Sequence, residues 1–403
     1  MSKQTKKRLV YINSWAMNSA LGDNKSTAKQ RLSQGVSEDM CLETGWLNDG
    51  KTTVVGKVTS RLPVIEGKFN TRNNQIALSV LLQIEEEIKS TVQRYGKDRI
   101  AVVVATSTSG ISDGESAIAK KQQVGEFPES YHYQQQELGN LGEFVAQHFN
   151  IEGPVYTIST ACSSSGRVFL SAKRLLNAGL VDAVIVGGAD SLCKLTLNGF
   201  HGLEALSTTH CNPFSENRNG INIGEAAAFM LLSNEKNNIS NNNNNSLALL
   251  GAGDSSDAHH ISAPHPEGKG AIEAMLNALD DAQLLAEDIG YINAHGTATA
   301  LNDAMEAKAI YQIFSNRVPV SSTKPFTGHA LGTASIIEAA IICLLLEEDI
   351  DLPKQVNDGR VDKTLAPILL VKAGQKLAKR AVLSNSFAFG GNNVSIILGA
   401  DNE

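Results

Sequence analysis

The 403-residue chain has only five cysteines, and no two of them form a C-x-x-C pair. Disulfide frameworks and zinc sites need closely spaced cysteines, so this spacing argues against both and favours a reducing, cytoplasmic location. The 35 basic residues are outnumbered by 42 acidic ones, so no chain-wide positive charge favours nucleic acid. The longest apolar run, residues 336–346, contains Glu338 and is too short to cross a bilayer. We therefore expect a buried helix there and no membrane span.

Short apolar runs alternate with longer amphipathic segments along the chain. We predict strands at 100–105, 155–159, 183–187, 226–232, 247–251, 289–293, 318–322, 382–386 and 394–398. We predict helices at 75–92, 163–178, 271–282, 303–314 and 334–347. Continuous apolar strands separated by helices are typical of buried parallel or mixed sheets, so the fold class is α/β and the strand at 155–159 should be buried.

An asparagine-rich segment, residues 237–245, divides the chain into two parts with the same alternation of strands and helices. Such a polar run cannot bury apolar surface, and we interpret it as a solvated connector. The pattern predicts two similar α/β halves, residues 1–245 and 246–403. Residue identity between the halves does not demonstrate a duplication.

Cys162 lies between the predicted strand 155–159 and the predicted helix 163–178. The first N–H groups of a helix have no intrahelical partner, and the positive end of the helix dipole favours a thiolate there. Because the thiolate is the reactive form, Cys162 is a candidate nucleophile. Cys162 alone fits an inert buried cysteine equally well.

His295 follows the predicted strand 289–293, beside Gly296, where α/β proteins place functional groups. Thr297 and Thr299 offer hydroxyls that could bind a polar, amide-bearing chain. The alternative is a turn histidine with purely structural hydrogen bonds.

His329 follows the predicted strand 318–322, and Lys324 lies five residues before it. A nearby ammonium would keep an imidazole neutral and could stabilise an anionic transition state, although most lysines are surface residues. The small-residue loop within 384–393 contains Phe389. Its N–H groups could form an oxyanion hole and Phe389 a steric gate, or the segment could be a β-turn with core aromatics.

These segments together resemble the β-ketoacyl-acyl carrier protein synthases of the thiolase superfamily. The matches lie at 160–164, 212–214, 218–220, 224–225, 293–299, 323–329 and 385–391, in the order and spacing of that family. The resemblance implies a thiolase-like, five-layered αβαβα sandwich of two similar halves. It further implies a homodimer, or a heterodimer with a related synthase subunit.

The implied reaction is a decarboxylative Claisen condensation. Cys162 would accept an acyl group from a carrier-protein thioester and pass it to the carbanion formed when malonyl-acyl carrier protein loses carbon dioxide. His295 and His329 would stabilise the enolate, supported by Lys324 and Glu306. No metal or cofactor is implied, since the substrates are carried on the phosphopantetheine of acyl carrier protein.

The remaining implied contacts concern the oxyanion and the carrier. The N–H groups of Cys162 and Phe389 would hold the thioester oxyanion, and Thr297 and Thr299 would contact the phosphopantetheine arm. Because carrier proteins are generally acidic, docking should involve positive side chains. The candidates are Arg61, Lys68 and Arg72, although each is equally a solvated surface charge.

Four positions depart from the family pattern. Ala388 and Asn392 stand where Gly and Thr are common, and Ala298 and Ala300 replace the usual Ser and Pro. These departures indicate synthases of accessory pathways, such as aryl polyene or other polyketide-type assembly.

Three alternative classes are weighed against the condensing enzyme. A thiolase would carry a second cysteine in its C-terminal glycine-rich loop, and residues 384–393 contain none. A chain-length-factor-like partner subunit, which is non-catalytic, would usually lack the nucleophile. A Cys–His–Asn hydrolase would need only one histidine.

Overall fold

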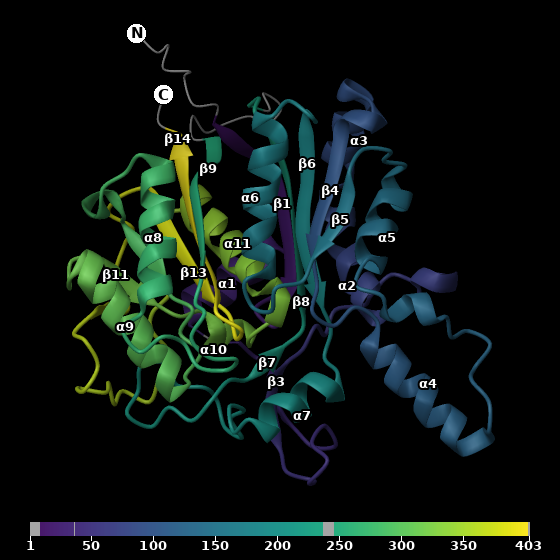
Figure 1. Ribbon diagram of the computed structural model, residues 1–403, viewed down its shortest axis with the longest axis horizontal. Helices are drawn as coiled ribbons and strands as arrows, with labels where there is room; N and C mark the ends of the chain where they lie inside the picture. Colours follow the sequence, from purple (N-terminus) through teal and green to yellow (C-terminus); the bar gives the residue numbers. More distant parts are fainter. Residues whose placement is uncertain (1–8, 36, 237–245, 402–403) are drawn as a thin grey trace.

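The computed structural model describes residues 9–35, 37–236 and 246–401, so the predicted connector at 237–245 lies outside the described residues (Figure 1). Eleven of the described strands form one mixed sheet with the order β12-β11-β10-β13-β14-β9-β1-β8-β6-β4-β5. They are β1 (Val10–Ser19), β4 (Ile100–Ala105), β5 (Val155–Ile158), β6 (Ala183–Asp190), β8 (Ala226–Ser233), β9 (Ser246–Ser256), β10 (Tyr291–Asn293), β11 (Pro319–Ser321), β12 (Leu369–Leu370), β13 (Ala381–Phe387) and β14 (Asn392–Asp401).

The strand order repeats within this sheet. In the order β1-β8-β6-β4-β5, β8 is antiparallel to its neighbours β1 and β6, and β4 is parallel to its neighbours β6 and β5. The order β9-β14-β13-β10-β11 has the same directions. The two repeats meet where β1 pairs with β9 through Val10–Leu249 and Tyr11–Ala248. Topology thus reveals the internal repeat that residue identity does not, while the boundary at residue 245 stays a prediction.

Helices cover both faces of each repeat and form three layers. The middle layer contains α6 (Ser164–Asn177) and α11 (Ala334–Glu347), whose apolar residues share one core with strands of both repeats. The helices α2 (Arg72–Leu81), α3 (Glu85–Tyr95) and α5 (Asn140–Phe149) cover the outer face of the first repeat. The helices α8 (Lys269–Ala282) and α9 (Ala300–Phe314) cover the outer face of the second (Figure 1). The three helical layers and the two sheet repeats between them make five layers, as in the predicted αβαβα sandwich. The middle helices share one core with both repeats, and each outer helical layer has a core of its own.

The middle position of α11 explains its composition. A helix that packs against other elements all round is apolar all round, and every α11 residue from Ala334 to Leu346 is buried. The sequence prediction of a buried helix at 336–346 is therefore confirmed. None of the helices in the described part of the chain has the length and apolarity needed to cross a membrane.

Two predictions are wrong: the burial of the strand at 155–159, which does form, and the continuity of the helix at 75–92. The strand predicted as buried at 155–159 is β5, the last strand of the sheet, and Tyr156 is 37% exposed because only β4 pairs with it among the described strands. The helix predicted at 75–92 is two helices, α2 and α3, joined by a 3-10 turn at Leu82–Ile84. Three acidic residues, Glu85 to Glu87, favour a new helix start there, because negative charge is stable in the first turn.

The remaining elements lie outside the repeated framework. A small second sheet contains β2 (Met40–Glu43), β3 (Thr53–Gly56) and β7 (Ile223–Gly224). The other helices are α1 (Lys25–Gln34), α4 (Ile111–Val124), α7 (Lys194–Gly202) and the short α10 (Lys324–Thr327). Figure 1 shows α4 projecting away from the sandwich.

Candidate active site

Cys162 lies in a strained turn between β5 and α6. The residue before it, Ala161, has a φ of 53°, a left-handed conformation that costs a non-glycine residue about 1 kcal/mol. Ser164 holds this turn, because its Oγ accepts a hydrogen bond from the Thr160 N–H at 2.8 Å and donates one to the Ala161 carbonyl at 2.5 Å. The serine-rich segment after the cysteine therefore fixes the position of the sulfur.

His329 comes from the connection between α10 and α11. Its N–H donates to the Asn222 carbonyl at 2.7 Å, and its own carbonyl accepts the Gly224 N–H at 3.1 Å. Gly328 makes this approach possible: its φ is 68°, and a Cβ there would lie 2.7 Å from the Gly224 nitrogen. The imidazole Nδ1 accepts the Leu331 N–H at 3.1 Å, which leaves Nε2 facing the sulfur.

His295 follows β10, and Glu306 of α9 holds its backbone. The two carboxylate oxygens of Glu306 accept the His295 N–H at 2.8 Å and the Gly296 N–H at 2.7 Å. Glu306 is fully buried, and burial raises its pKa to about 7, although the two N–H groups lower it. The carboxylate therefore positions the loop that carries the imidazole. Nδ1 of His295 is buried and has no hydrogen-bond partner.

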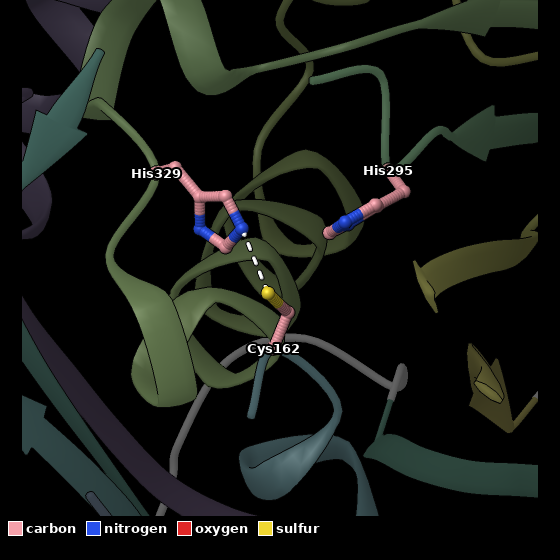
Figure 2. Close-up of side chains that lie close together, drawn as sticks. All are labelled: Cys162, His295 and His329. Atoms are coloured by element: carbon pink, nitrogen blue, oxygen red, sulfur yellow. Dashed lines mark hydrogen bonds between the residues drawn. The ribbon is translucent and has the colours of Figure 1, made fainter. Parts of the chain in front are cut away.

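The three side chains converge, as Figure 2 shows. Nε2 of His329 lies 3.1 Å from Sγ of Cys162, and the two imidazole rings are 5.3 Å apart and nearly perpendicular. One nitrogen of each histidine and the sulfur all lie within 4.8 Å of one another. All three residues are buried, with exposed fractions of 2% to 6%.

The site favours uncharged forms of all three groups. Burial lowers the pKa of His295 and of His329 well below 6.5, and the Lys324 ammonium lowers both further. Burial also raises the pKa of the Cys162 thiol to about 11, although Lys324 and the N–H groups of Phe389 and Cys162 lower it. The sequence-based expectation of a resting thiolate is therefore wrong, because the loss of hydration outweighs these favourable charges and dipoles.

Cys162, His295 and His329 are close enough together to be considered as metal ligands, but the hydrogen bonding of His329 argues against metal binding. A neutral imidazole has one N–H, and Nδ1 of His329 is an acceptor for the Leu331 N–H, so Nε2 carries the proton. A protonated nitrogen has no lone pair for a metal ion. His329 is thus held as a hydrogen-bond donor toward the sulfur and toward any oxygen that lies beside it.

Lys324 forms a fully buried ion pair with Glu338, a residue the sequence did not identify as functional. Lys324 Nζ lies 2.6 Å from Glu338 Oε1, and both side chains are 3% exposed. Burial raises the pKa of Glu338, and the Lys324 ammonium opposes that shift. Glu306 and Lys324 were both expected to support the histidines: Glu306 accepts the N–H of His295, and Lys324, which lowers the pKa of both imidazoles, has Glu338 as its ion-pair partner. The signal was present in the sequence as the single carboxylate inside the apolar stretch at 336–346.

We predict that Lys324→Met lowers the free energy of unfolding by about 3–5 kcal/mol, because it leaves Glu338 buried without its partner. The double variant Lys324→Met/Glu338→Leu should recover most of this loss, since it removes both buried charges. Urea unfolding measures both effects. A single variant as stable as the parent, or a double variant as unstable as the single one, would contradict the prediction.

A cavity of about 480 Å³ leads from the surface to Cys162, His295 and His329. Thr297 and Thr299 both line it, and their hydroxyls are 2.9 Å apart. Phe389 lines it as well and packs against Phe200 of α7, with ring centroids 5.7 Å apart. The predicted substrate-contact residues therefore lie along a single path to the sulfur.

The loop that carries Phe389 joins β13 to β14 and is tied to a second loop at 257–265. The Gly390 N–H donates to the Ile261 carbonyl at 2.8 Å, and the Asp257 N–H donates to the Gly391 carbonyl at 2.7 Å. Gly391 has a φ of 79°, and a Cβ there would lie 2.1 Å from the Asp257 carbonyl oxygen. Glycine is required at this contact, and movement of Phe389 must also involve the second loop.

An internally repeated αβαβα sandwich with a buried cysteine and two neutral histidines at one end of a cavity defines a thiolase-like protein. Comparison with known families is consistent with this class. The family model "Beta-ketoacyl synthase, N-terminal domain" matches residues 65–238, and "Beta-ketoacyl synthase, C-terminal domain" matches residues 248–357. Together with the relatives described next, these matches show that the chain belongs to the β-ketoacyl synthase family.

Two curated relatives are named 3-oxoacyl-[acyl-carrier-protein] synthase 2. The Staphylococcus aureus protein is 30% identical over 347 residues, which cover 82% of this chain and 85% of that protein. The Rhizobium meliloti (strain 1021) protein is 35% identical over 268 residues, and the match spans only 63% of its length. Among solved structures, one chain of the complex between the ketosynthase ApeO and its chain length factor ApeC from Xenorhabdus doucetiae has a TM-score of 0.93 and 45% identity, with both chains fully covered. The predicted family and fold are confirmed.

Proposed function

We propose that the protein is a β-ketoacyl-acyl carrier protein synthase that elongates a fatty acid or polyketide chain by decarboxylative condensation. One observation carries the proposal: a buried thiol and two neutral imidazoles lie together at the inner end of a cavity lined by hydroxyls. Neither a metal nor a resident cofactor takes part in the proposed reaction, because the acyl groups arrive on the phosphopantetheine of acyl carrier protein.

In the first step Cys162 takes the acyl group. Its sulfur attacks the carbonyl carbon of the acyl-carrier thioester, the bond to the arm's sulfur breaks, and the proton of Cys162 ends on the released arm. The backbone N–H groups of Cys162 and Phe389 both lower the pKa of the sulfur, so both are near enough to stabilise negative charge at this point. They are the proposed oxyanion hole.

In the second step the bond between the malonyl methylene and its carboxylate breaks, and carbon dioxide leaves. The remaining electron pair forms an enolate, whose carbon attacks the acyl-cysteine and displaces the sulfur, which regains a proton from solvent. No general base is needed, since decarboxylation generates the carbon nucleophile. The enolate oxygen needs neutral donors, and His329 Nε2–H is already fixed as one by the Leu331 N–H. His295, held by Glu306, is the proposed second donor.

We propose a dimer, in which this chain pairs with a second copy or with a related, chain-length-setting subunit. The X. doucetiae structure is described as a ketosynthase in complex with its chain length factor, which supports pairing with a related, chain-length-setting subunit. The strand β5 supports pairing in general, because its outer edge carries no partner among the described strands and an unpaired edge invites another chain. The free state of all five cysteines supports a reducing, cytoplasmic compartment.

The alternative is a non-catalytic chain-length-factor-like role for this chain itself. A subunit that only shapes a tunnel has no need of a nucleophile beside two fixed imidazoles. The presence of Cys162, His295 and His329 in contact geometry therefore favours catalysis.

The test is product formation from carrier-bound substrates. We expect the protein, together with its partner subunit where one is required, to convert acyl- and malonyl-carrier protein into a 3-ketoacyl product two carbons longer, detected by mass spectrometry. A panel of aliphatic and aromatic primers identifies the acyl class. Absence of elongation with every primer, while the carriers are loaded and the protein is folded, would refute the proposal.

A further inference from the structure

A buried carboxylate that the proposed reaction does not use lies at the end of β6. Asp190 is 0% exposed, and its Oδ1 accepts the N–H groups of Ser107 at 2.7 Å and Thr108 at 2.9 Å, in the turn that follows β4. The hydroxyls of Thr106 and Thr108 donate to the same oxygen at 3.1 and 2.9 Å. Asp190 therefore holds this turn to the end of β6, the strand that pairs with β4.

The second oxygen of Asp190 reaches the other repeat. Oδ2 accepts the N–H of Thr333 at 2.9 Å and its hydroxyl at 3.0 Å. Thr333 is fully buried and is the N-cap residue of α11, four residues after His329. Burial raises the pKa of Asp190, but N–H groups face both oxygens and leave neither of them to carry a proton. One ionised side chain thus joins the turn after β4 to the start of α11.

The segment that carries His329 is therefore fixed on both sides. Backbone hydrogen bonds hold His329 itself, and Asp190 holds the end of the turn that follows it. Within this turn Leu331 has a φ of 49°, and its N–H donates to the imidazole Nδ1. Gly332 packs so closely that a Cβ there would lie 2.6 Å from the Ser107 Oγ. A strained turn of this kind persists only where its surroundings hold it.

Asp190 also lies near enough to the sulfur to act on it. Burial is the main reason that the pKa of the Cys162 thiol is raised, and the Asp190 carboxylate raises it further. Its negative charge therefore disfavours the reactive thiolate. Any benefit of Asp190 to the reaction must come from the groups that it holds in place.

We propose that Asp190 and Thr333 are positioning residues for the condensation: their hydrogen bonds hold the turn that presents the Nε2–H of His329 to the sulfur and to the enolate oxygen. This inference rests on the proposed function. Leu331 is the link, since its N–H fixes the tautomer of His329 two residues before Thr333. A reacting group displaced by about 1 Å can cost about 10² in rate, so a small shift of this turn is enough to matter.

The test compares Thr333→Val with Thr333→Ser. Valine has the shape of threonine without its hydroxyl, and serine keeps the hydroxyl, so only the valine variant loses that bond to Asp190. We expect Thr333→Val to lower kcat for carbon dioxide release from malonyl-carrier protein by about tenfold, with KM within about twofold. Thr333→Ser should restore most of the rate. Asp190→Asn should lose more than Thr333→Val, because a carboxamide has one acceptor oxygen in place of two.

The matched control is Thr53→Val. It also removes a fully buried hydroxyl, one that donates to the Ser207 carbonyl at 2.9 Å, and Thr53 does not line the cavity. Its kcat should equal that of the parent.

A double-variant comparison separates the positioning of His329 from general damage. In a His329→Ala background we expect Thr333→Val to change the rate by less than about twofold, because the group that it positions is absent. Nuclear magnetic resonance with isotope-labelled histidine gives a second readout. The imidazole N–H signal that His329→Asn removes should shift in Thr333→Val and in Asp190→Asn, and should stay in place in Thr53→Val.

Three outcomes would overturn the inference: equal losses in the parent and His329→Ala backgrounds, a raised KM without a lowered kcat, and an unshifted His329 signal in Thr333→Val. Failure of the proposed function gives a different result, since the unsubstituted protein would then release no carbon dioxide and form no 3-ketoacyl product. The His329 signal would still decide whether Thr333 holds the imidazole. Thr333→Val keeps the buried charge and the side-chain shape, so it tests the inference even where Asp190→Asn does not fold.

Discussion

Cys162→Ala is expected to reduce condensation by about 10⁴-fold or more, because no other group in the cavity can form the acyl thioester. The other cysteines do not line the cavity that reaches the two histidines. The loss should appear in two measurements: no acyl adduct on the intact protein by mass spectrometry, and no 3-ketoacyl product.

The matched control for this variant is Cys193→Ala, which also removes a fully buried free thiol, one that lies near Thr196 instead of the histidines. It should keep condensation close to the parent value. Both variants should melt cooperatively near the parent temperature, since each removes a single sulfur atom. Elongation by the Cys162→Ala protein would end the assignment of Cys162 as the nucleophile.

The double variant His295→Ala/His329→Ala is expected to lower malonyl-carrier decarboxylation by about 10³-fold or more. Removal of one preorganised donor to a developing oxyanion costs about 10²–10³ in rate, and this variant removes two. Carbon dioxide release from malonyl-carrier protein measures the step without the need for an acyl acceptor.

Two further variants define the role of these imidazoles. His329→Asn keeps a neutral N–H donor and should lose less activity than His329→Ala. His148→Ala, on α5 in an outer layer, removes a histidine that does not line the cavity and should leave the rate unchanged. Decarboxylation preserved in the double variant would refute the enolate-stabilising role.

The sequence could single out the three side chains that converge in the cavity because each one follows a strand end within a short, distinctive segment. Cys162 follows β5, His295 follows β10, and His329 follows β11 through α10. The neighbouring strands β10 and β11 are parallel and end at the same edge, so local position places His295 near His329. Cys162 belongs to the other repeat, and only the packing of the middle layer brings it to the two imidazoles. The pKa of Cys162 could not be inferred the same way, since it depends on how completely the surrounding layers exclude water.

Other features depended on contacts that the local sequence does not encode. The exposure of β5 follows from its place at the end of the strand order, which no property of residues 155–158 determines. The pairing of Lys324 with Glu338 joins α10 to α11, and only the packing of α11 in the middle layer makes that pair buried. The division between α2 and α3 could have been predicted from the sequence, because the acidic residues Glu85 to Glu87 are typical of the first turn of a helix.

The nucleophile and its histidines come from different repeats of the fold. Cys162 lies just before α6, the middle-layer helix of the first repeat, and His329 lies before α11, the middle-layer helix of the second. A hydrogen bond joins the two helices, in which the Ser165 Oγ accepts the N–H of Ile336. A chain in which only one repeat has folded therefore carries either a sulfur or its imidazoles, never both. Condensation, which needs the sulfur and the imidazoles together, is therefore expected only after the two repeats have docked, and its rate reports directly on that docking.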